Sequence, residues 1–218
     1  MIRSEKFSRF FIFLFFYFLV ADLRAQQVRK GIKSLSRPEK CWVAAHPFIA
    51  KKAWRCTQQV RYVTDSIEKA GTLRDGNGGQ LDAFRHAFWM ASLAQIIPAK
   101  KAIRLGKAHE KGNYIDFKKG RLEENARPDS LAGVMDLRNN EAGIDAGKNY
   151  RADTAANKIS LEESIVHLVW DGKLTIVKKD AAGNILSCEG NRVEAEKYTG
   201  KWFIPKCLVS SDLVQVMH

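Results

Sequence analysis

The sequence predicts a mainly α-helical protein that carries a small β-hairpin appendage near its C-terminus. Apolar residues recur at helical spacing between about 47 and 170, and the period changes to two after residue 171. Hydrophobic residues make up 45% of the 218-residue chain, so it can bury a core, which excludes a disordered or low-complexity protein. No internal repeat is visible, so we expect one helical domain rather than a repeat array.

Helix boundaries in the first half follow from residues that start or stop helices. Pro47 suits a first helical turn, because its missing N–H is not needed there. Pro98 ends the second helix, and Gly112 with Asn113 is expected to end the third. The glycine cluster at 75–79 lacks both phosphate-binding glycine frames, so we interpret it as a turn. In chain order, the expected helices cover residues 47–69, 82–97, 99–111, part of 114–125, 129 or 130 to 147, and 161–170.

The last two of these helices have capping residues of their own. Asp129 or Ser130 can accept hydrogen bonds from the first backbone N–H groups of a helix that follows Pro128. Ser160 and Glu163 stand at the spacing of a capping box, which opens the final helix.

Beyond the last helix, the pattern is typical of short strands. A hairpin is expected from 174–176 through a turn at 178–184 to 185–186. Residues 202–209 are expected to form an edge strand, which tolerates Pro205 because one side of an edge makes no ladder bonds.

The N-terminus has the pattern of a signal peptide. Basic residues precede an uncharged apolar run at 10–21, and cleavage is expected after Ala25. The run is too short for a bilayer core of about 30 Å, so we expect an exported protein, periplasmic or secreted, with no transmembrane segment in the mature chain. The predicted division of the chain is a signal peptide at 1–25, a basic irregular lead at 26–40, a helical domain at 41–170 and a β appendage at 171–218.

Four cysteines in an exported chain favour disulfides. Sequence alone allows three pairings, and we favour Cys41 with Cys56 and Cys188 with Cys207, because each bridge would close a local segment. Zinc binding by these cysteines is the rival interpretation, and the absence of a C-x-x-C spacing argues against it.

The formal net charge of +12 favours an anionic partner, either a substrate or the envelope surface. The basic residues are dispersed, and no specific nucleic-acid motif is visible. The oligomeric state stays open at this point.

Three expected helices each carry polar residues on one face. On the helix at 82–97, otherwise apolar on nearly all sides, these residues share one stripe through i, i+3 and i+4 spacing. If the three helices pack together, the polar faces form one pocket. Its members are Asp82, Arg85 and His86, then His109 and Glu110, then Asp136, Asn139 and Asn140.

Imidazoles and carboxylates are the ligands of hydrolytic zinc, manganese and iron sites. We therefore predict a divalent metal held by His86, His109 and Asp136, with Asp82 and Asn139 orienting the ligands from behind. The order of residues is similar to that of HD-type phosphohydrolases, with Glu110 in place of an aspartate. The predicted catalytic residues, including a general base and two groups that hold a substrate oxyanion, are Glu110, Asp136, Arg85 and Asn140.

Two other interpretations remain open. Glu110 and Asp136 can serve as a general acid and a base or nucleophile for glycoside cleavage without a metal. Alternatively, the polar residues form a buried structural network in a non-catalytic envelope binding or interaction module.

Three segments carry a family resemblance, namely 78–90, 105–114 and 135–143. They resemble an uncharacterised family of exported bacterial domains with a DAFRHAxW, AHE and MDLxNNxxG signature, related to domains at the C-termini of polymorphic-toxin-like proteins. No activity is established for this family. The resemblance implies that the polar residues above and Gly143 are signature positions, and the toxin-like setting favours an enzyme.

Overall fold

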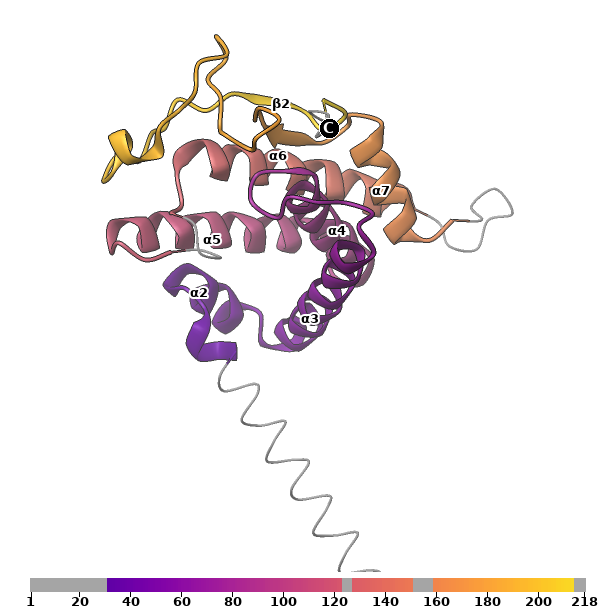
Figure 1. Ribbon diagram of the computed structural model, residues 1–218. Coiled ribbons are helices and arrows are strands. Elements are labelled where there is room, and N and C mark those ends of the chain that lie inside the picture. Colours follow the sequence, from indigo (N-terminus) through magenta and orange to yellow (C-terminus); the bar gives the residue numbers. More distant parts are fainter. Residues whose placement is uncertain (1–30, 123–126, 151–158, 214–218) are drawn as a thin grey trace, which may run out of the picture.

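The computed structural model describes residues 31–122, 127–150 and 159–213, and within them the fold is mainly helical, as predicted (Figure 1). The predicted signal peptide lies outside the described residues. None of the described helices is both long enough and apolar enough to cross a membrane. The elements are α2 (Arg37–Ala45), α3 (Pro47–Ala70), α4 (Gln80–Ile96), α5 (Ala99–Lys118), α6 (Ser130–Asn149), α7 (Leu161–Trp170), β1 (Thr175–Val177), the short 3-10 helix η1 (Ala195–Tyr198) and β2 (Leu208–Ser210).

Helix α4 is the centre of the fold and packs against α3, α5, α6 and α7 (Figure 1). Phe84 and Ala87 join a core cluster with residues of α3, α7 and β1, whereas Met90 and Leu93 join a second cluster with residues of α2 and α5. All four side chains are fully buried or nearly so. The apolar character of this helix on nearly all sides therefore reflects a helix enclosed by others, as predicted.

Two glycines on α6 let its backbone approach α4 closely. A Cβ at Gly143 would lie 2.1 Å from the carbonyl oxygen of Ala87, and one at Gly147 would lie 2.4 Å from that of Ala91. Real side chains do not come so close, so only glycine permits this separation of the two helices. The two contacts are one turn apart on each helix, so together they fix the register of α6 along α4.

The predicted irregular lead at 26–40 is wrong within the described residues, because 31–34 are helical and α2 begins at Arg37. Ser36 and Glu39 form a capping box in which Ser36 N–H donates to Glu39 Oε2 at 2.7 Å. The predicted end of the third helix is also wrong. Gly112 lies inside α5, where a Cβ would lie 2.4 Å from Ser36 Oγ, so this glycine permits close packing of α2 on α5.

The other predicted caps are confirmed. Asp129 Oδ1 accepts hydrogen bonds from the N–H groups of Leu131 and Ala132 at the start of α6. Ser160 and Glu163 form the capping box that begins α7.

The β segment pairs differently from the prediction. β1 pairs antiparallel with β2, with Ile176 opposite Val209, and the expected hairpin contributes only an isolated bridge between Lys179 and Ile185. Of the expected strand at 202–209, only Leu208 and Val209 belong to β2. Pro205 lies before the paired residues and has no N–H to donate to a ladder.

Residues after 171 form part of the main body. Leu174 and Ile176 belong to the first core cluster, and β1 contacts both α4 and α6. In Figure 1 this segment runs along α6 and next to α7. The predicted appendage is thus packed onto the helices that carry the polar residues.

One of the two favoured disulfides is present, between Cys188 and Cys207. Cys41 and Cys56 are free thiols, which differs from the prediction. The reason is their orientation, because Cys41 is exposed while Cys56 packs against both core clusters. Burial raises the pKa of the Cys56 thiol to about 11, which keeps it protonated at neutral pH.

We predict that Gly143→Ala lowers the free energy of unfolding by about 2–3 kcal/mol, because the new methyl group must push α6 away from Ala87. Urea unfolding measures this change. Gly133→Ala is the matched control on the same helix: its Cβ would meet Glu110 Oε2 at an ordinary 3.5 Å. We expect this control to be neutral or stabilising by up to about 1 kcal/mol. Equal losses in both variants would contradict the packing argument.

Candidate functional site

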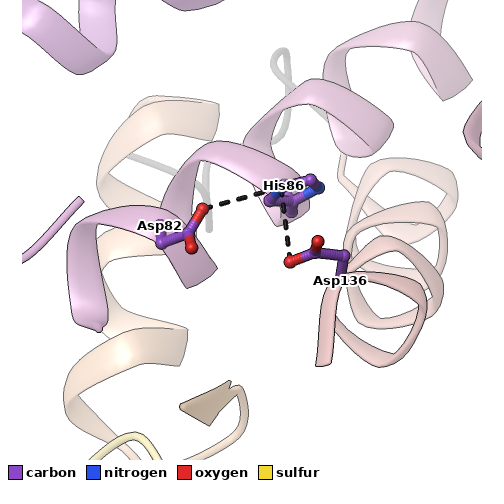
Figure 2. A group of neighbouring side chains, drawn as sticks. All are labelled: Asp82, His86 and Asp136. Atoms are coloured by element: carbon purple, nitrogen blue, oxygen red, sulfur yellow. Dashed lines mark ion pairs between the residues drawn. The ribbon is translucent and has the colours of Figure 1, made fainter. Parts of the chain in front are cut away.

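The centre of the site is formed by Asp82, His86 and Asp136. Asp82 and His86 stand one turn apart on α4, and Asp136 faces them from α6 (Figure 2). His86 Nε2 lies 3.6 Å from Asp82 Oδ1 and 3.4 Å from Asp136 Oδ1. Each residue offers one ligand atom, and these three atoms all lie within 4.8 Å of one another.

These distances suit ligands around an ion better than hydrogen bonds. A hydrogen bond from a ring N–H to oxygen measures about 2.7–3.2 Å, shorter than either contact of His86. Two ligand atoms each about 2.1 Å from a tetrahedral ion lie about 3.4 Å apart. The three residues therefore fit a divalent cation in chemistry, and the two contacts of His86 have the spacing of neighbouring ligands.

Burial determines the charge of the imidazole. His86, Asp82 and Asp136 are each at most 7% exposed. Burial lowers the pKa of His86 well below its ordinary value, the charges of Arg85 and His109 lower it further, and the polar contact with the Asn140 amide opposes them. The ring is therefore neutral at pH 7 and has the lone pair that a metal ligand needs.

Asp82 is fixed in place by two donors. Gly78 N–H donates to Oδ2 at 2.7 Å, and Arg85 Nη2 donates to Oδ1 at 2.5 Å. The glycine-rich turn before α4 thus orients a carboxylate. Because Arg85 partly balances the charge of Asp82, it also reduces the cost of burying this carboxylate.

Asn139 and Asn140 are neighbours with different roles. Asn139 is fully buried; its Oδ1 accepts from Thr175 N–H at 2.8 Å, and its Nδ2 donates to Thr175 O at 2.9 Å. These bonds attach β1 to α6. Asn140 is buried beside His86, and within the described residues its amide atoms and His86 Nδ1 have no hydrogen bond of good geometry. Asn140 thus has unused hydrogen-bonding capacity beside His86, but it is not among the described residues that line either cleft.

His109 lies near the centre but outside the three-residue group. Its ring centroid is 6.3 Å from that of His86, and its Nδ1 is 3.0 Å from Oε1 of Glu39. Burial raises the pKa of Glu39, but the contacts with His109 and Ser36 outweigh burial, so the pKa is lowered and the carboxylate is ionised. Asp82 rather than His109 thus stands among the potential ligands.

Glu110 lies between α5 and α6. Its Oε2 accepts from Asn113 Nδ2 at 3.2 Å and lies near Gly133, almost one turn before Asp136. It is not among the described residues that line the two clefts below.

Two clefts meet at Arg85 and His86, which line both of them. The tryptophan cleft, about 170 Å³, is largely apolar and is lined by residues that include Trp42, Trp54 and Trp89, with Glu39 and His109. The lysine cleft, about 350 Å³, contains Asp82 and Asp136 and is bordered by Lys179, Lys201 and Lys206. The three central residues are therefore buried but stand at the base of an open cleft.

Sequence reasoning missed several residues of these clefts. Glu39 fell within the expected irregular lead, although the spacing of Ser36 and Glu39 was itself the signal of a capping box. Arg127 and Lys201 lie in irregular segments, and no periodicity marks them.

The fold and site together define a class of protein: a mainly helical domain with two carboxylates and one imidazole buried between two helices and lining a basic cleft. The chain belongs to the family described as Domain of unknown function (DUF6973), whose model matches residues 40–171. No curated protein and no solved structure gives a match. The matched range contains all three central residues, whereas Lys179, Lys201 and Lys206 follow it.

We predict that Asn139→Ala lowers the free energy of unfolding by about 2–3 kcal/mol, because it leaves both backbone groups of Thr175 without their partner. Asn140→Ala is the matched neighbour, and we expect a smaller loss because its amide makes no well-formed hydrogen bond to a described residue. Thermal or urea unfolding distinguishes them. A larger loss for Asn140→Ala would mean that Asn140 belongs to the scaffold.

Proposed function

We propose that the protein is a metal-dependent hydrolase that acts on an anionic substrate. The observation that carries the proposal is the buried group of Asp82, His86 and Asp136, with its ligand-like spacing and its position at the base of a basic cleft. Zinc, manganese and iron all accept imidazole and carboxylate ligands. A divalent ion held there would polarise a substrate oxygen and lower the pKa of a bound water.

The surrounding residues fit supporting roles. Arg85 borders both clefts and is placed to hold an anionic oxygen of the substrate next to the three ligands. Asn140 offers an amide donor beside His86. Glu110 stays our predicted general base; its Oε2 lies near Gly133 of α6, three residues before Asp136, and it is not among the described residues that line the two clefts. Asp82 takes the ligand position that the sequence suggested for His109.

The Cys188–Cys207 disulfide supports the export expected from the N-terminal sequence, because such bridges persist mainly in oxidising compartments. A periplasmic or extracellular hydrolase would meet anionic envelope polymers and nucleic acids. We therefore include both among the substrates to be assayed.

The first test is metal content. We predict about one zinc, manganese or iron ion per chain in protein purified without a histidine tag, measured by mass spectrometry. His86→Ala and Asp136→Asn should lose the ion while the helical circular dichroism spectrum is retained. Hydrolysis of a chromogenic phosphodiester should fall to background in the same variants.

His167→Ala is the matched control, because His167 is an exposed histidine on α7, away from the site. It should keep both ion and activity. If the unmodified protein binds none of these ions under metal-replete conditions, the metal proposal is wrong, and the non-catalytic binding module gains support. If the ion is lost equally from His167→Ala, the metal is not bound at this centre.

A further inference from the structure

One wall of the lysine cleft is formed by the loop that the Cys188–Cys207 disulfide closes. Cys188 and Cys207 are 19 residues apart, and the chain between them contributes Tyr198, Lys201 and Ile204 to the cleft. This loop follows the matched domain, which ends at residue 171. The family domain alone therefore does not complete the cleft.

The loop is fixed to the helices at several points. The N–H of Ser130, the first residue of α6, donates to the carbonyl oxygen of Trp202 at 2.9 Å. The Trp202 ring packs against Tyr114 and Phe117 of α5, with centroids about 5 Å apart. The disulfide and these contacts hold the loop at a defined distance from the ligand residues.

The cations that line the cleft differ in whether they form ion pairs with described residues. Arg85, Lys179 and Lys206 each form an ion pair, with Asp82, Asp75 and Asp129 respectively. Arg127 and Lys201 also line the cleft, both are exposed, and neither forms an ion pair with any described residue. Lys201 lies over the ring of Tyr198 at 5.5 Å, which keeps its ammonium group next to the cleft. Both cations are thus available to a ligand in the cleft.

We propose that Arg127 and the disulfide-closed loop, through Lys201, bind the phosphate group of a phosphate-ester substrate. This inference rests on the proposed function for its chemistry, since it names the substrate class of the same site. A phosphate group has several charged oxygens, so it can contact two cations and a ligand ion at once, whereas a carboxylate has only two oxygens. The rings of Tyr198 and Phe117 in the cleft offer apolar surface to the rest of the ester.

The experiment is equilibrium binding of inorganic phosphate, measured by isothermal titration calorimetry on the metal-loaded protein and on protein treated with a chelator. We expect Arg127→Gln/Lys201→Gln to weaken phosphate binding about tenfold or more in both forms. Ion content should be unchanged, because neither residue is among the ligands. Both side chains are exposed, so the fold should be retained.

Arg192→Gln/Lys197→Gln is the control for charge. It removes the same two charges from exposed residues of the same loop that do not line the cleft. Phosphate binding within about twofold of the unmodified protein is expected for it. An equal loss in both double variants, or no measurable phosphate binding to the unmodified protein, overturns the inference.

The two proposals fail separately. If no metal is bound but phosphate binding depends on Arg127 and Lys201, the proposed hydrolase mechanism is wrong while the phosphate site stands. A second outcome is that metal is bound, that sulfate competes equally with phosphate, and that the Arg127→Gln/Lys201→Gln change alters the affinity for neither anion. In that case the metal centre stands and the phosphate site is wrong.

Discussion

The close approach of α4 and α6 is the constraint on which the rest of the structure depends. Gly143 and Gly147 lie against the carbonyl oxygens of Ala87 and Ala91, so the two backbones approach more closely than any pair of side chains would allow. Asp136 lies on the same face of α6, two turns before Gly143. The packing that fixes the helix separation therefore also sets the 3.4 Å between Asp136 and His86.

The site is built at a cost to the core. Asp82 and His86 take buried positions on α4, which supplies both apolar clusters, and Asp136 takes one on α6, where apolar side chains would stabilise the fold more. The chain limits this cost locally, because Gly78 and Arg85 donate to Asp82. A polar group retained at such a position is more informative about function than a polar group on the surface.

Local signals predicted the features that depend on a few neighbouring residues. The caps at Asp129 and Ser160 and the common stripe of Asp82, Arg85 and His86 needed only sequence spacing. Non-local packing decided the rest. From the local sequence, Gly112 predicts a helix end. In the structure it lies within α5, because Ser36 packs against it. The pairing of β1 with β2 and the contact of Glu39 with His109 join distant segments that no local period can identify.

The loop between Cys188 and Cys207 lies outside the matched domain, so the proposed ion ligands and part of the cleft wall come from different parts of the chain. The proposed ion ligands belong to the shared domain, while much of the surface in front of them belongs to the chain that follows it. A relative that carried a different C-terminal extension would keep the proposed ion ligands and present them to a different compound. In such a family, the domain would identify the chemistry, and the extension would identify the target.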